Sequence, residues 1–247
     1  MIAQVRAELL KQRSTRTNLG LLSALLGLVL LVVVLHGFSV PAEDLGRRSV
    51  QLTDIFGRAA MLGSLFAALL GAMSITGEFR HGTIRPTFLL APRRGSVAGA
   101  KVLVGMLLGV AFGLIAAAVA AGVGSAVLRA RGIGIDLDWG DYALLLAGSA
   151  AAAAMWAAIG VGVGALIRNQ VPATVGICAW LLFVEGLLAG DVGVVGDVAR
   201  YLPGALGNAA SGQVPPVAPG LAVLLLALYA AAAATAGWRA TDRRDVA

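Results

Sequence analysis

The sequence is poor in the residues on which most soluble enzymes depend. Its 247 residues include one cysteine and two histidines, and only 13% are charged, against roughly 25% in a soluble domain. The single cysteine, Cys178, cannot form an intrachain disulfide, and we expect it to be a packing residue in an apolar run. His36 and His81 are too few for a histidine-based zinc site or a serine triad. Enzyme activity is therefore not expected of this chain.

A nucleotide-binding loop is also missing from the sequence. The pattern G-x-x-x-x-G-K-[ST], whose backbone cradles phosphates, does not occur. The segment 95–101 comes nearest, but Ala100 precedes its lysine and Val102 follows it. The chain is therefore not expected to bind ATP or any other cofactor itself.

Apolar residues dominate the chain instead. They make up 59% of it, and the mean hydropathy is +0.88, which indicates an integral membrane protein. A net charge of +6 would suggest nucleic acid in a soluble protein. Here the basic residues collect beside apolar stretches, as membrane insertion and anionic headgroups favour. We expect membrane lipids rather than nucleic acid as partners, and a single transmembrane domain over residues 1–247.

Six apolar stretches are long enough to cross a bilayer as helices, which predicts an all-α, polytopic fold. They cover residues 19–36, 55–76, 102–128, 142–167, 171–189 and 217–238. Before them, residues 1–17 place Ile2, Val5 and Leu9 on one helical face and basic residues on the rest. This pattern predicts an amphipathic helix lying in the membrane interface. The first span is too long for a signal peptide and no A-x-A site follows it, so we expect it to remain uncleaved.

The segment 77–101 is the longest polar interruption of the apolar sequence. It contains five basic residues and a single acid, Glu78. Gly82 can close one helix, and a short helix over Thr83 to Ala91 can follow it. Ser96 is the expected N-cap of the third span. A short helix between two spans has the shape of a docking element.

Basic residues are divided unequally between the two sides that six spans define. Thirteen Lys and Arg residues lie on the side of the two termini and of segment 77–101, and six lie on the other side. Because Lys and Arg accumulate on the cytoplasmic side, both termini are expected in the cytoplasm. The excess of Arg over Lys and the abundance of Ala and Gly are typical of a GC-rich bacterial genome, which indicates the bacterial cytoplasmic membrane.

The segment 77–101 resembles the cytoplasmic loop of ABC-2 type permeases, the membrane subunits of bacterial ATP-driven exporters. The residues that carry the resemblance are Glu78, Phe79, Arg80, His81, Gly82, Thr83, Pro92, Arg93, Arg94 and Lys101. In that family the loop between the second and third spans forms the coupling helix, which sits in a cleft of the ATPase subunit. The resemblance extends over the whole chain through the six spans, the N-terminal interfacial helix and an external segment, 190–216, with a short helix expected around Val194 to Leu202.

The resemblance implies a coupling role and a set of partners. The residues expected to couple to the ATPase are Glu78, Phe79, Arg80, Gly82, Thr83, Pro92, Arg93 and Arg94. Two ATPase subunits, which hold ATP and magnesium, would join two permease copies or this chain and a close relative. The expected substrate is amphipathic, such as a drug, antibiotic, peptide or lipid, because an Ala/Leu/Val-rich wall offers few polar anchors. The alternative is a loop that only fixes topology and contacts anionic lipid.

Three polar residues within the spans are candidates for a translocation pathway. Glu185 lies inside an apolar run, where a carboxylate costs about 2.5 to 3.5 kcal/mol at mid-bilayer, so it should face protein or water. In ABC-2 permeases the second and fifth spans border the route, which makes Glu185 a pathway candidate. The alternative is a structural acid near the outer interface, protonated or paired with Arg58 or Arg200. Asp54 and Arg58, four residues apart, are expected to neutralise each other near the outer surface.

Two other functions remain open from the sequence. A proton-coupled secondary transporter would use Glu185 as its relay, although no repeated halves of the kind such folds often show are detectable. A membrane scaffold or immunity protein would transport nothing. Co-purification of an ATPase separates the exporter from both.

Overall fold

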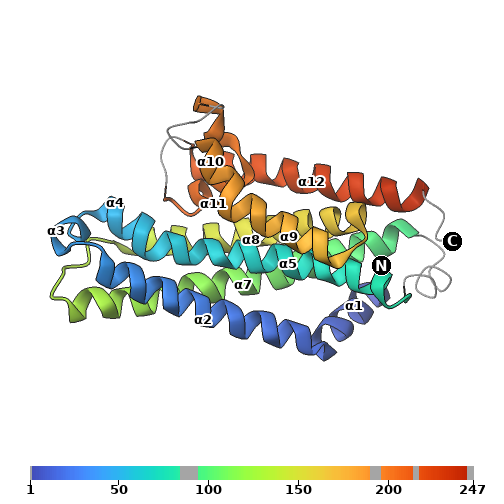
Figure 1. Cartoon of the computed structure of the whole chain (residues 1–247), viewed down its shortest axis with the longest axis horizontal. Helices are drawn as coiled ribbons and strands as arrows, with labels where there is room; N and C mark the ends of the chain where they lie inside the picture. The colour runs from blue at the N-terminus through green and yellow to red at the C-terminus, as the bar shows by residue number, and fades with distance from the viewer. Residues whose placement is uncertain (1, 84–93, 190–195, 214–216, 244–247) are drawn as a thin grey trace.

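The structure is a computed structural model that describes residues 2–83, 94–189, 196–213 and 217–243. Every regular element in these residues is helical, as expected (Figure 1). The long helices and the segments that continue them are α1 (Ile2–Ser14), α2 (Arg16–Ser39), η1 (Gln51–Gly57), α5 (Arg58–Arg80), α7 (Arg94–Ala130), α8 (Trp139–Ile167), α9 (Gln170–Ala179), η2 (Trp180–Val184), α10 (Glu185–Ala189) and α12 (Pro219–Arg243). The shorter elements are α3 (Ala42–Leu45), α4 (Arg48–Val50), η3 (Gly196–Tyr201) and α11 (Pro203–Ala210).

Six helices in the described residues are long and apolar enough to cross a membrane, so the expected six-span plan is confirmed. They run over Arg16–Ser39, Arg48–Arg80, Gly95–Ala130, Trp139–Ile167, Gln170–Leu188 and Pro219–Asp242. Two spans begin earlier than their apolar stretch because a polar residue caps them. Asp138 and Asp141 form a capping box that begins α8 at Trp139, and Asn169 caps α9.

The centre of the bundle is the contact between α5 and α8. Both are buried over most of their length. By contrast, less than a quarter of the most apolar stretch is buried in each of the spans Arg16–Ser39, Gln170–Leu188 and Pro219–Asp242. Glycines allow the close approach: a Cβ on Gly160 would lie 2.0 Å from the carbonyl oxygen of Ala68, and one on Gly71 would lie 2.1 Å from that of Ala157. Small residues at such contacts let membrane helices approach closely. The helices α2, α7, α9 and α12 pack around this pair and carry exposed apolar side chains.

One end of the bundle gathers most of the elements that the sequence singled out. The helix α1, the start of α2, the end of α5, the start of α7, the turn between α8 and α9 and the end of α12 all lie there (Figure 1). We call it the terminal end, and the other the opposite end. That the terminal end faces the cytoplasm stays a prediction from the charge bias.

At the opposite end, short helical elements are held together by the buried side-chain amide of Gln51. Gln51 is fully buried; its side-chain nitrogen donates to the carbonyls of Leu45 (2.8 Å) and Gly134 (2.9 Å), and its oxygen accepts from the N–H of Asp136 (3.1 Å). These bonds fasten the α7–α8 connection to η1. In the segment 190–216, η3 covers part of the helix expected around 194–202, and α11 follows it; residues 190–195 and 214–216 lie outside the described residues.

Candidate functional site

The helix α5 ends in a cap centred on Gly82, as the sequence predicts. The N–H of Thr83 donates to the carbonyl of Glu78 (3.0 Å), and the N–H of Gly82 donates to that of Phe79 (3.3 Å). This pair of bonds is a Schellman motif, and it requires a left-handed residue after the helix. Gly82 supplies it with φ +66°. The direction in which the chain leaves α5 is therefore fixed.

The rest of the expected coupling segment lies only partly within the described residues. Of the short helix expected over Thr83 to Ala91, only Thr83 is described, and Pro92 and Arg93 also lie outside. The expectation for Ser96 is wrong. The helix α7 already begins at Arg94, so Ser96 lies in its first turn instead of preceding it as the N-cap.

A cluster of four charges, three of them buried and the fourth half exposed, joins the two ends of the connection between α5 and α7. Lys101, in α7, has 2% of its surface exposed, and its ammonium donates to Glu78 Oε1 of α5 at 2.7 Å and to Glu8 Oε1 of α1 at 2.8 Å. Lys11 of α1 donates to the same Glu78 oxygen at 2.9 Å and lies 3.7 Å from Glu8 Oε2. The four charges sum to zero. We call these four residues the ionic cluster.

Burial determines what the ionic cluster does. An ion pair removed from water gains little net stability, but removing one partner leaves an uncompensated charge and costs about 3 to 5 kcal/mol. The cluster therefore imposes one arrangement on α1, α5 and α7. Partial burial lowers the pKa of Lys11, but the hydrogen bond and charge of Glu78, with help from Glu8, outweigh it, so the pKa is raised above its usual 10.5. Lys11 thus stays charged in the cluster at neutral pH.

Two members of the ionic cluster, Glu8 and Lys11, were not singled out by the sequence analysis. The helix α1 buries Glu8 against the protein and leaves Ile2 and Leu9 exposed, on the side that the prediction of an interfacial helix turns toward the membrane. A signal was present: Glu8 is the only acid of this basic helix, and Lys11 follows it at helical spacing. The protein-facing side of α1 is thus its polar side.

Further contacts fix the neighbours of the ionic cluster at the terminal end. The guanidinium of Arg168, at the turn between α8 and α9, lies 5.2 Å from the ring centre of Phe79 and donates to the carbonyl of Ala240 in α12 (3.0 Å). Arg80 is bonded weakly to Gln170 of α9 (3.5 Å). The end of α5 therefore contacts the turn between α8 and α9, and Arg168 of that turn links it to the end of α12.

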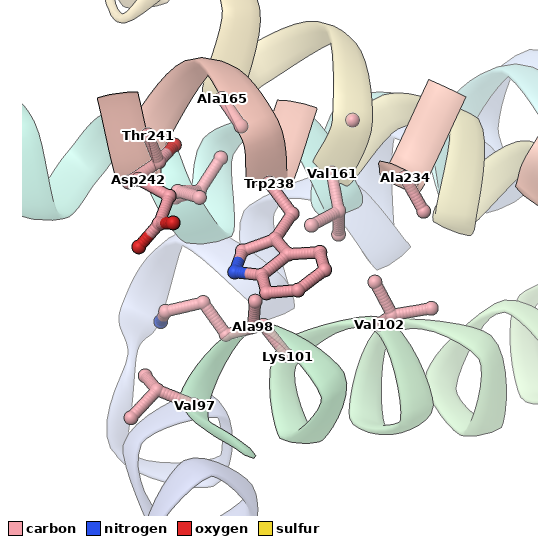
Figure 2. Close-up of a pocket in the computed structure, with 12 residues that line it drawn as sticks. Val97, Ala98, Lys101, Val102, Val161, Ala165, Ala234, Trp238, Thr241 and Asp242 are labelled. Carbon is pink, nitrogen blue, oxygen red and sulfur yellow. The ribbon is translucent and has the colours of Figure 1, made fainter. Parts of the chain in front are cut away.

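A small cavity lies beside the ionic cluster, between α7, α8 and α12. Its volume is about 30 Å³, and Figure 2 shows Trp238 reaching from α12 toward α7, with Lys101 on the α7 side. A Cβ on Gly95 would lie 3.4 Å from the indole of Trp238, so the ring packs on the first turn of α7. The start of α7 is therefore attached to α12 through Trp238, as well as to α1 and α5 through the ionic cluster.

Two larger hollows adjoin each other along α5 and α9. The first, of about 490 Å³, opens between α1, α2 and α5 at the terminal end and is lined by polar groups including Lys11, Arg80 and Asn18. The second, of about 440 Å³, is mostly apolar and is lined by residues of α5, α9 and η2. Met73 and Gln170 line both. A polar hollow thus continues into an apolar groove.

The three pathway candidates lie toward the opposite end and form two separate arrangements. Arg58 Nε donates to Asp54 at 2.8 Å, as expected from their spacing. Glu185 accepts from the backbone N–H groups of Gly204 (2.8 Å) and Ala205 (3.1 Å) and from the indole N–H of Trp180. Glu185 therefore caps the start of α11 rather than pairing with Arg58 or with Arg200, whose guanidinium lies over the Tyr201 ring.

Comparisons with known proteins add no relative to this description. No family model matches the chain, and a search of curated proteins found no match. Within the described residues, no group of three or more His, Cys, Asp or Glu side chains is placed to hold a metal ion. The function proposed below rests on the residues and their geometry.

Proposed function

We propose that this multi-pass membrane protein is the permease subunit of an ABC-2 type exporter. In this proposal a separate ATPase subunit binds ATP and magnesium and drives an amphipathic substrate out of the cell. Two copies of the chain, or the chain and a close relative, join two ATPase subunits. Residues 81–93, which connect α5 to α7, receive the ATPase.

The observation that carries the proposal is the ionic cluster. A partner that pushes on a connection moves the attached helices together only if both ends of the connection are firmly attached. Glu78 precedes the connection and Lys101 follows it, and their charged groups lie 2.7 Å apart. Glu8 ties Lys101 to α1, and Lys11 ties Glu78 to the same helix. A push on residues 81–93 would therefore displace α1, α5 and α7 as one unit.

The packing of α5 supplies the next step of the proposed mechanism. On one side α5 packs on α8, and on another it borders both hollows together with α9. A displacement of α5 relative to α9 changes the width of these hollows. Alternating access would then follow from the motion of α5 against α9, as the ATPase pair closes and opens.

The two adjoining hollows support an amphipathic substrate. A polar head fits the hollow at the terminal end, where hydroxyl, amide and basic groups line the wall. An apolar tail fits the groove along α9, whose wall includes Val175 and Phe183. A purely polar solute would leave the groove unfilled, and a purely apolar one would leave the polar groups without partners.

The test begins with a partner search. The tagged chain, extracted from its native bacterial membrane, is expected to retain an ATP-hydrolysing subunit that mass spectrometry identifies. Reconstituted together in vesicles, the two should move a fluorescent amphiphile only with ATP and magnesium. Transport that follows a proton gradient without ATP would replace this proposal with the secondary-transporter alternative. Absence of both the partner and transport would support the scaffold alternative.

A further inference from the structure

Two buried polar groups on α8 have no hydrogen-bond partner among the described residues. They are the indole nitrogen of Trp156 and the hydroxyl of Ser149, whose residues are 3% and 4% exposed. They lie seven positions apart, which places them on one face of the helix. An indole nitrogen is a donor only, and a donor left unbonded inside a membrane protein is costly.

Both groups line the same small cavity between α5, α8 and α11. The cavity is also bordered by the polar residues Ser64, Asn208, Ser211 and Gln213. Ser211 and Gln213 are bonded to each other (2.6 Å), so they do not compensate for Trp156. The cavity therefore has several polar side chains in its wall and at least one donor that needs an acceptor.

The size of the cavity selects its occupant. The space open to the centre of a water molecule is about 10 Å³, and one water needs roughly 10 to 15 Å³ of such space and two to four polar partners. Gly207 of α11 keeps the space in front of the indole open: a Cβ at this position would lie 3.8 Å from Trp156 Nε1 and 3.7 Å from the Ala152 Cβ.

We propose that this cavity is a water-binding site within the membrane-spanning bundle, formed by Trp156, Ser149 and the polar face of α11. The water accepts the indole N–H of Trp156, and its own hydrogens reach the hydroxyl and amide oxygens that line the cavity. The contact between α8 and α11 is therefore hydrated. Gly204, whose N–H is bonded to Glu185, lines the same cavity, so the water lies beside the cap of α11.

Radiolytic hydroxyl-radical labelling with mass spectrometry tests this site, because radicals formed from a bound water oxidise the side chain beside it. The measurement uses the full chain in detergent or nanodiscs, with no partner. Trp156 should be oxidised although it is buried, whereas the fully buried Phe56 should not. Exposed Trp139 is the positive reference. Oxidation of Trp156 no greater than that of Phe56 would overturn the proposal.

A pair of glycine variants makes the test specific. Gly207→Ala adds a methyl group at ordinary contact distance in the cavity and should abolish labelling of Trp156. Gly176→Ala, in α9, adds the same group where no atom lies within 4 Å and should leave labelling unchanged. Persistent labelling in Gly207→Ala would show that the radicals come from elsewhere, which contradicts the site. If Gly207→Ala does not fold, the comparison of Trp156 with Phe56 in the unsubstituted chain decides. None of these results depends on transport.

Discussion

Glu78 and Glu185 are buried to the same extent, 8% exposed each, but the protein stabilises them in different ways. At the terminal end, Glu78 receives two lysine ammoniums from other helices. At the start of α11, Glu185 receives three N–H groups, two from the backbone and one from Trp180. A buried carboxylate that is neutralised by opposite charges is destabilised when one of those charges is removed. A carboxylate that accepts from neutral N–H groups can be replaced by another group that has an acceptor oxygen. The two sites should therefore respond differently to substitution.

The largest effect is expected from Lys101→Met. It leaves Glu8 and Glu78 buried with only the half-exposed Lys11 nearby, and should destabilise the protein by about 3 to 5 kcal/mol. Denaturation in detergent measures the loss. Arg13→Met, at an exposed base on α1, should change stability little. Adding Glu8→Gln and Glu78→Gln to Lys101→Met should recover stability; if it does not, charge imbalance is not the cause.

A smaller effect is expected from Glu185→Gln. The amide oxygen still accepts from the start of α11, so the loss should be about 1 to 3 kcal/mol, the difference between a charged and a neutral acceptor. Glu185→Leu removes the acceptor and should cost more. Transport per assembled complex should be unchanged by Glu185→Gln. A changed substrate preference in a fully assembled complex would instead indicate that Glu185 lines the pathway.

The Gly82 cap next to Glu78 gives a matched pair of substitutions with opposite signs. Gly82→Ala forces a side chain into a left-handed conformation and should destabilise by about 1 kcal/mol. Gly122→Ala, inside α7 with open space around its Cβ, should stabilise by about as much. If residues 81–93 receive the ATPase, only Gly82→Ala should lower ATP-driven transport. Equal transport in both variants would argue against coupling through this connection.

The smallest effect is expected from Lys11→Gln, because Lys11 is half exposed and Lys101 still compensates Glu78. Since folding raises the pKa of Lys11, its contribution is complete below its usual pKa and is lost only as pH rises through the raised value. The stability difference between Lys11→Gln and the unsubstituted chain should therefore be constant from about pH 6 to 9. A difference that disappears in this range would show that the Lys11 ion pair does not form.

The sequence located individual polar residues correctly but assigned partners only where these are close in the chain. Asp54 and Arg58, four residues apart, pair as expected. Gly82 ends α5 as expected, since a left-handed cap is a local feature. By contrast, two of the three partners of Glu185 lie on α11, which the sequence did not delimit because Gly and Pro obscure its short apolar pattern.

The sequence by itself determined the six spans and the helical class, because a backbone in hydrocarbon must satisfy its hydrogen bonds within each segment, and an apolar stretch of sufficient length does so as a helix. Only the tertiary structure decided that Glu8 joins Lys101, 93 positions away, and that Lys101 lies inside the bundle rather than on a basic loop. The physical reason is that a buried charge takes its partner from whichever helix packs beside it, and packing depends on the shapes of all the helices together.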